Sequence, residues 1–254
     1  MNTLELSILL PAFLAGLLVL ATHIPFGMHV MQRGVIFADL AVAQIAGLGV
    51  VIGGLLNLTE HPVLIQLIAA LSALLGAALL TWIEHRLGDV KEACIGLTFV
   101  LAASLGILLM SHDVHAGEHL KDLLVGQILW CSPNQLIATA VLSSALLLIW
   151  YTLRQSFQHF GFYALFALAV TASVQLVGIY LVFASLIVPA LATHRLSQHR
   201  LKFAWLIGIA AYALGLTISA TFDLPTGAAI VWAMAITGGL VALFKHDNAA
   251  EQIH

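Results

Sequence analysis

The segment Ser111–Pro133 reads SHDVHAGEHLKDLLVGQILWCSP and is the longest polar interruption in an otherwise almost continuously apolar chain. Histidines and carboxylates crowd its first half, between residues 112 and 122. The apolar run Leu123–Cys131 follows and is too short to cross a bilayer, because a spanning helix needs about 20 residues. The segment is therefore the reference point from which we place the rest of the chain.

The composition of the chain predicts a polytopic membrane protein. Its 254 residues are 61% hydrophobic and 8% charged, with a mean hydropathy of +1.05, whereas soluble domains carry roughly 25% charged residues. A net charge of −3 argues against nucleic acid as a partner. Cys94 and Cys131 match no paired zinc or redox pattern. Since no linker composition interrupts the chain, we expect a single integral-membrane domain over residues 1–254.

The apolar runs predict an all-α bundle of about nine membrane crossings plus one re-entrant segment, Leu123–Cys131. The crossings are expected within Leu4–Met31, Val35–Leu56, Val63–Ile83, Ala93–Met110, Leu136–Leu153, Gly161–Thr193 (two short helices), Phe203–Thr221 and Gly227–Phe244. The first run contains Pro11, Pro25 and Gly27, which predict a kink or a break. The 33-residue run that holds two helices is expected to break near Gly178 and again near Pro189.

The basic residues predict the orientation, because Lys and Arg concentrate in short cytoplasmic loops. If Leu123–Cys131 enters the membrane and returns to the same side, eight of the nine basic residues lie on one face and only Lys121 lies on the other. This arrangement places the N-terminus outside, the C-terminus in the cytoplasm and Ser111–Pro133 on the outer face.

The polar half of Ser111–Pro133 is a candidate contact for a metal in transit. His115 and His119 are spaced i, i+4, as are Glu118 and Asp122, so a helix would place each pair on one face. With His112 these side chains offer imidazole and carboxylate ligands, which suit zinc and similar divalent ions. The alternative is a solvated outer loop whose polarity only keeps it out of the lipid.

Polar residues inside the predicted spans are a second set of candidates: His23, His29, Asp39, Gln44 and Gln175. Ionisable groups within the membrane are costly, and this makes each a functional hypothesis. Asp39 lies near the inner end of the second span, and Gln44 follows one helical turn later, roughly in line with it. For Asp39 the alternatives are pairing with Arg33 or stabilisation by a helix N-terminus. For the others the alternative is a packing role.

Several motifs are missing from the sequence. It contains no GxxxxGK[ST] loop to hold ATP phosphates, no HExxH and no GxSxG. We therefore expect no catalytic residues, no bound cofactor and no enzymatic activity.

Four segments of the chain together resemble a known group of proteins. They are MQRGVIFADLAVAQIAGLGVVIG (31–53), KEACIGLTFVLAASLGILL (91–109), KDLLVGQILWCSPNQL (121–136) and ASVQLVGIYLVFASLIVPALAT (172–193). In this order they resemble the membrane permeases of bacterial zinc/manganese-type ABC importers, and the third segment is the most specific match.

The resemblance implies a helical bundle of the type shared with cobalamin and siderophore importers. It also implies a homodimer in the bacterial inner membrane, a cytoplasmic ATPase beneath it and an extracytoplasmic metal-binding protein above it. The permease would move a divalent metal, with zinc favoured by the many histidines, into the cytoplasm.

The chain departs from the family pattern in two places. Asp39 matches the aspartate of the second span, but the histidine usual four residues later is Ala43. The segment after Arg154 is also shorter than usual and lacks the helix that docks on the ATPase, so HRLSQHRLK at 194–202 is a candidate replacement. An ATP-independent divalent-metal carrier or channel is therefore an alternative. A non-transporting membrane scaffold is a third, which the polar residues inside the spans disfavour.

Overall fold

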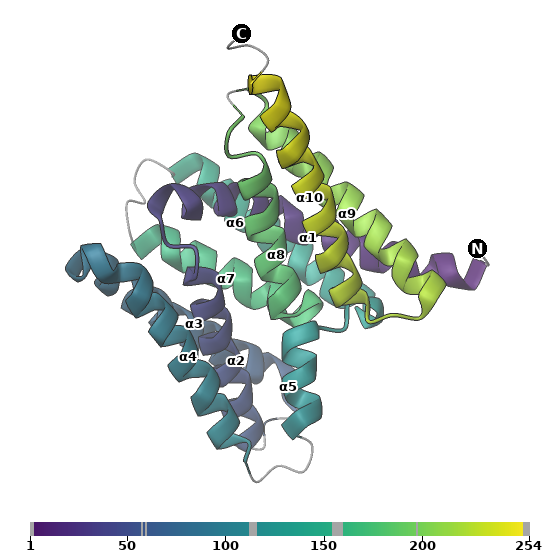
Figure 1. The fold of residues 1–254 in the computed structure, drawn as a ribbon. Helices are drawn as coiled ribbons and strands as arrows, with labels where there is room; N and C mark the ends of the chain where they lie inside the picture. Colours follow the sequence, from purple (N-terminus) through teal and green to yellow (C-terminus); the bar gives the residue numbers. More distant parts are fainter. Residues whose placement is uncertain are drawn as a thin grey trace. The chain divides into compact units, whose positions relative to one another are not determined.

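The computed structural model describes residues 3–56, 58, 60–111, 116–153, 160–196 and 198–250, and the regular elements in these ranges are all helices (Figure 1). The longer helices are α1 (Thr3–Arg33), α2 (Ala38–Leu55), α3 (Pro62–Arg86), α4 (Lys91–Leu109), α6 (Pro133–Leu153), α7 (Phe160–Val177), α9 (Arg200–Phe222) and α10 (Thr226–Ala250). The shorter ones are α5 (Ala116–Val125), α8 (Ile179–Ala192) and two 3₁₀ turns, η1 (Gly88–Val90) and η2 (Ile128–Trp130). The predicted all-α class is confirmed.

Eight of the described helices are long and apolar enough to cross a membrane: α1 to α4, α6, α7, α9 and α10. The ninth predicted crossing corresponds to α8, which is apolar but only 14 residues long. A 14-residue helix is shorter than the roughly 20 residues that a full crossing needs.

The predicted breaks in the apolar runs are only partly correct. The 33-residue run does divide at Gly178, which has a φ of 79° and separates α7 from α8. Pro189, however, lies inside α8, and both Pro11 and Pro25 lie inside the continuous helix α1. A proline removes one backbone donor, but neighbouring helices and side chains in a membrane bundle compensate the freed carbonyl.

The run predicted to be re-entrant, Leu123–Cys131, is not one helical piece. Its first residues complete α5, Gly126 then adopts a φ of 71°, and η2 forms a single turn. Gly126 follows directly on the last residue of α5, in the left-handed conformation that glycine adopts at helix ends. That this run enters the membrane stays a prediction.

The chain divides into two compact units. Unit 1 comprises Met1–Gln32, Val125–Ala140 and Leu176–His254, and unit 2 comprises Arg33–Leu124 and Val141–Gln175. The single domain expected over residues 1–254 stays a prediction.

Small residues bring the helices of unit 2 close together. α2 packs against α3 and α4, and the three helices lie side by side (Figure 1). A Cβ atom placed on Gly49 of α2 would lie 2.7 Å from the Cα of Ala69 in α3, and one placed on Gly76 of α3 would lie 2.9 Å from the Ile45 side chain. Close approach through small residues is typical of helices that associate in membranes, where dispersion contacts replace the hydrophobic effect.

Helix packing in unit 1 follows the same rule. α10 packs against α9 and α8, with Gly238 facing Val188 of α8. α1 contacts α9 where Gly208 leaves room for Leu20. Tyr212 of α9 is fully buried and its hydroxyl lies 3.0 Å from the Ser185 hydroxyl of α8, which satisfies both polar groups inside an apolar core.

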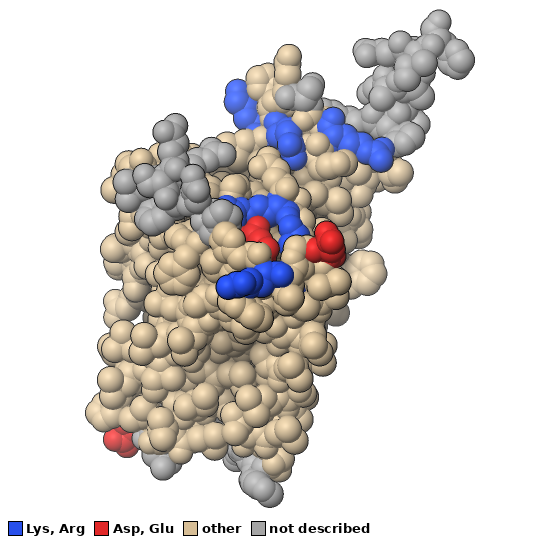
Figure 2. All heavy atoms as spheres, turned by 90° about the vertical axis from the view of Figure 1, so that its left-hand side faces the viewer, with Lys and Arg blue, Asp and Glu red and all other residues tan. Residues whose placement is uncertain are grey.

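The surface is largely apolar, as expected for a protein surrounded by lipid. Figure 2 shows a wide area without charged side chains, and only some of the Lys and Arg side chains on this face lie beside Asp and Glu side chains. Large apolar residues point outward, including Leu75, which is 72% exposed, and Trp232, which is 71% exposed. Such a surface would drive a soluble protein to aggregate, whereas it suits a lipid environment.

Candidate functional site

Asp39 is the most unusual polar residue of unit 2. It lies in the first turn of α2, is 1% exposed, and neither carboxylate oxygen has a hydrogen-bond partner among the described residues. A buried carboxylate without partners is unfavourable, and more so where lipid replaces water. The favourable N-terminal end of the α2 dipole compensates only part of this. Burial without a partner therefore marks Asp39 as the first candidate for a functional group in unit 2.

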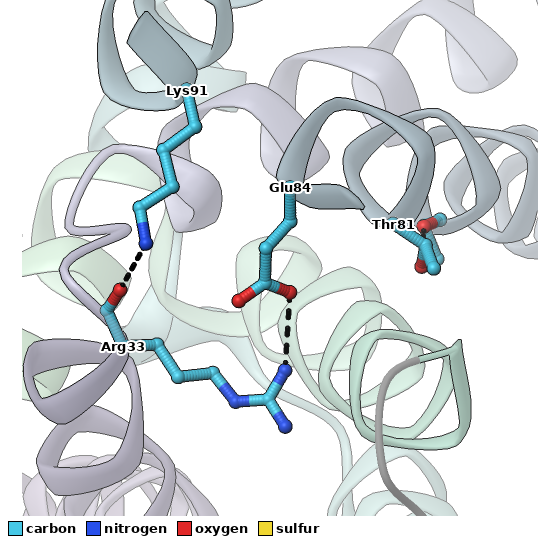
Figure 3. A network of polar contacts seen from close by, with 5 residues as sticks. Arg33, Thr81, Glu84 and Lys91 are labelled. Carbon is cyan, nitrogen blue, oxygen red and sulfur yellow. Dashed lines mark hydrogen bonds and ion pairs between the residues drawn. The ribbon is translucent and has the colours of Figure 1, made fainter. Parts of the chain in front are cut away.

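Arg33, the partner considered for Asp39, is engaged elsewhere. Its guanidinium Nη1 lies 3.2 Å from Oε2 of Glu84 in α3, and both side chains are mostly buried (Figure 3). The same guanidinium lies 4.8 Å from the ring centroid of Phe162 in α7, in a cation–π contact. The alternative in which Arg33 pairs with Asp39 is therefore not what the structure shows, because the guanidinium binds the Glu84 carboxylate and lies over the Phe162 ring.

The connection between α1 and α2, residues 33–37, is held by the first two residues of α4. Lys91 Nζ donates to the Arg33 carbonyl at 2.7 Å (Figure 3). The Phe37 N–H donates to Glu92 Oε1 at 2.9 Å. Gly34 makes the turn with a φ of 64°. These contacts set where α2 begins, and so where Asp39 lies.

Ala43 stands where the permeases that the sequence resembles usually have a histidine, and it shares the buried side of α2 with Asp39. Ala43, four residues later, is 1% exposed, so it and Asp39 both face inward. Gln44 is half-buried, and the prediction that it lies in line with Asp39 is wrong. At 3.6 residues per turn, five residues turn the helix by roughly 140° beyond one full revolution.

His23 and His29 belong to α1 in unit 1, whereas Asp39 belongs to unit 2. His23 is fully buried, and its Nδ1 lies 3.0 Å from the Val19 carbonyl and 3.0 Å from the Thr22 hydroxyl. A carbonyl only accepts, so Nδ1 carries the proton in that bond and Nε2 keeps a lone pair. Nε2 has no hydrogen-bond partner in the described part of the chain. His29 is half-buried.

The structure describes little of the histidine and carboxylate cluster predicted for the outer face, residues 112–122. His112 and His115 are outside the described residues, and Glu118 and His119 belong to α5 without a description of their side chains. Asp122 is exposed on α5. The predicted metal contact at this cluster stays a prediction.

No three His, Cys, Asp or Glu side chains gather into a metal-binding group within the described ranges. The described part of unit 2 thus offers one buried, unpartnered carboxylate rather than a complete coordination shell. Weak coordination is what a transport pathway needs, because the ion must leave again.

Glu84, Lys91 and Glu92 form a polar network that sequence reasoning missed. Their signal was present in the polar stretch EHRLGDVKE at 84–92, directly after an apolar run. The basic residues of this stretch indicated one side of the membrane, and Lys91 and Glu92 fall in the segment 91–109, but the sequence predicted no contact for them. Gln175, noted as a polar residue in a span, does have a partner, since it accepts a hydrogen bond from Gln66 of α3.

Comparisons with known proteins agree with this fold. The sequence model of the ABC 3 transport family matches residues 5–162 and 152–245. The structure of PsaBC from Streptococcus pneumoniae in complex with Fab has a TM-score of 0.69 and 24% identity, over 92% of this chain and 89% of that chain. At this identity the similarity shows a shared fold.

The curated relatives are membrane proteins named for metal transport systems, and two of them illustrate the range of similarity. A probable iron transport system membrane protein of Haemophilus influenzae is 27% identical over 163 residues, which are 56% of this chain and only 60% of that protein. The high-affinity zinc uptake system membrane protein ZnuB of the same species is 22% identical over 263 residues, 95% of this chain and 98% of that protein. Since the family model covers nearly the whole sequence, the chain belongs to the ABC 3 transport family, as the predicted resemblance to metal-importer permeases required.

Proposed function

We propose that this chain is the membrane-spanning permease subunit of an ABC importer that carries a divalent metal ion, most favourably zinc, into the cytoplasm. The observation that carries the proposal is Asp39. A carboxylate that is 1% exposed, within a spanning helix and without a described hydrogen-bond partner, is best accounted for by a passing cation.

The ion would meet this carboxylate as a temporary ligand. The negative charge at the start of α2 replaces part of the water that the ion loses on entering the membrane. Ala43 stands where a histidine would add a second ligand. The protein therefore offers the ion few ligands at this point, so the ion would keep part of its water or bind other ligands. In unit 1, His23 Nε2 has no hydrogen-bond partner among the described residues and is a separate candidate ligand.

Zinc is favoured over harder ions by the ligand types around the proposed entrance. The chain has 12 histidines, and His112, His115 and His119 stand together on the predicted outer face with Glu118 and Asp122. Imidazole nitrogen suits zinc better than manganese. The relatives include one named for iron and one named for zinc, so the experiment below compares both metals.

Three partners belong to the proposal. The chain has no phosphate-binding loop of its own, so ATP hydrolysis would come from a separate cytoplasmic subunit. An extracytoplasmic metal-binding protein would deliver the ion to Ser111–Pro133, and a second copy of the chain would complete the pathway. The distribution of basic residues supports an N-terminus outside the bacterial inner membrane and a C-terminus in the cytoplasm.

An ATP-independent carrier or channel is the second candidate, and one observation favours it. α6 ends at Leu153 and α7 begins at Phe160, so only residues 154–159 are left for the segment that would dock on an ATPase.

Uptake measurements separate the two candidates. Zinc-starved cells that contain or lack this chain are supplied with radioactive Zn²⁺ or Fe²⁺, with a wild-type or a hydrolysis-deficient ATPase subunit. The importer predicts zinc uptake that needs both the chain and ATP hydrolysis. Uptake that persists with the deficient ATPase identifies the carrier or channel, and uptake that is unchanged without the chain excludes both.

A further inference from the structure

Lys91 and Glu92 bind opposite ends of the α1–α2 connection. The Lys91 ammonium donates a hydrogen bond to the last carbonyl of α1, that of Arg33, at 2.7 Å. The Glu92 carboxylate accepts the N–H of Phe37, which precedes α2, at 2.9 Å. All four residues belong to unit 2. Two adjacent residues at the start of α4 therefore hold the end of one helix and the beginning of the next.

The signs of the two charges match the helix ends that they hold. The C-terminal end of a helix leaves carbonyl groups unsatisfied and is partly negative, and the N-terminal end leaves N–H groups unsatisfied and is partly positive. Lys91 of α4 satisfies a carbonyl group at the end of α1, and Glu92 of α4 satisfies an N–H group at the start of α2. Phe37, the N-cap residue, makes no side-chain hydrogen bond to the helix, so a residue from α4 provides that interaction.

Side-chain packing holds only part of this connection. Gly34 turns with a φ of 64°, and a Cβ placed on it would meet nothing within 4 Å. Ile36 is 36% exposed and Phe37 is 45% exposed, while Val35 is buried. The position of the first turn of α2 depends in part on polar contacts, and among the side-chain contacts described for residues 33–37 the bond from the Phe37 N–H to Glu92 lies nearest to Asp39 in the chain.

We propose that Glu92 is a positioning residue for Asp39, and that Lys91 holds the other end of the same connection. Glu92 acts as a hydrogen-bond acceptor that fixes the first turn of α2, so that the Asp39 carboxylate stays in the buried position from which it contacts the metal. This inference rests on the proposed function of Asp39. Glu92 Oε2 is buried and has no hydrogen-bond partner among the described residues, so direct metal binding by Glu92 is the competing role that the experiment must separate.

The two substitutions of Glu92 separate these roles. Glu92→Gln keeps an oxygen that accepts from the Phe37 N–H but removes the charge, and Glu92→Ala removes both. Zn²⁺ is titrated into the purified full-length chain in lipid nanodiscs, and the binding that Asp39→Ala abolishes is assigned to Asp39. We expect Glu92→Ala to weaken this binding about tenfold and Glu92→Gln to change it less than about twofold. Asp89→Ala, at an exposed carboxylate three residues earlier, is the matched control and leaves binding unchanged.

A double substitution tests whether Glu92 works through Asp39. In the Asp39→Ala background, Glu92→Ala has no residual effect on Zn²⁺ binding if its role is positioning. An equal loss in both backgrounds overturns the inference, and so does a Glu92→Gln variant as weak as Glu92→Ala, which would make Glu92 a charged ligand. If Asp39→Ala itself binds like the wild type, the proposed function of Asp39 has failed instead.

Hydrogen exchange provides a reading that needs no metal. Glu92→Ala is expected to accelerate amide exchange in the first turn of α2, residues 38–41, whereas Glu92→Gln and Asp89→Ala leave it unchanged. Unaltered exchange in Glu92→Ala overturns the positioning role even where Zn²⁺ binding to the double variant is too weak to measure.

Discussion

At the residue scale, the proposed function depends on the carboxylate of Asp39. Asp39 is buried, lies at the start of a spanning helix and has no hydrogen-bond partner in the described chain. Groups in this state are retained in membrane proteins where they serve ions or protons. Arg33, which could have neutralised it, is committed to Glu84 and to the aromatic face of α7. Asp39 is thus without a described counter-charge, as the proposed metal-contact role needs.

The commitment of Arg33 can be tested by substitution. Arg33→Lys keeps the positive charge but loses the planar group that lies over Phe162, so we expect the folded protein to be less stable by about 1 kcal/mol. Thermal unfolding of the detergent-solubilised chain measures this difference. Arg86→Lys, at an exposed residue of α3, is the control and should not lower the unfolding temperature. An unchanged temperature for Arg33→Lys would show that the stacking contributes nothing.

At the scale of elements, the joint after α5 is a tightly constrained point of unit 1. Gly126 has a φ of 71°, and a Cβ placed on it would collide with the backbone of Val177 and Gly178, at the break between α7 and α8. A Cβ placed on Gly227, near the start of α10, would collide with the Val125 carbonyl. Backbone therefore meets backbone on both sides of one short segment.

This crowding predicts opposite outcomes for two glycines with similar backbone angles. Gly126→Ala combines an unfavourable φ with a collision against backbone that cannot move aside, so we expect little folded protein in the membrane fraction. Gly34→Ala has a φ of 64° but open space around the new Cβ, and it should cost only about 1–2 kcal/mol. Size-exclusion chromatography of both variants after solubilisation compares them. Equal yields would contradict the account of this joint.

The helices could be predicted from the sequence where one local feature governs them. The apolar runs located the spanning helices, and Gly178 marked the break between α7 and α8 because its positive φ is accessible mainly to glycine. The expected break at Pro189 was wrong, because this proline lies inside α8. Pro11 and Pro25 do not interrupt α1, and the kink expected there stays a prediction. Whether a proline ends a membrane helix depends on its tertiary neighbours, which local patterns do not reveal.

For the candidate site, too, the sequence predicted the residue itself but not its contacts. Asp39 was predictable, since a charge in an apolar run stands out. The contacts that place it were not, because Lys91 and Glu92 reach the α1–α2 connection from more than fifty residues further along the chain. The expected alignment of Gln44 failed on helix geometry alone.

At the scale of the whole molecule, the proposal requires a defined orientation in the membrane. Cysteines introduced at Asp122 and at Gln198, after Cys94 and Cys131 are replaced by serine, test it. A membrane-impermeant maleimide applied to intact spheroplasts should label Asp122→Cys directly and Gln198→Cys only after lysis. The reverse pattern would place the histidine cluster in the cytoplasm and contradict import through it.

Zinc uptake by variants of Asp39 tests the central claim most directly. Asp39→Asn has nearly the same shape without the charge, and Asp223→Asn changes an exposed carboxylate in the α9–α10 turn as a control. Initial rates of radioactive zinc uptake are compared in zinc-starved cells, at equal amounts of protein in the membrane. We predict that Asp39→Asn lowers the rate at least about tenfold, while Asp223→Asn transports like the wild type. Undiminished uptake by Asp39→Asn would contradict the role of this carboxylate in the metal pathway.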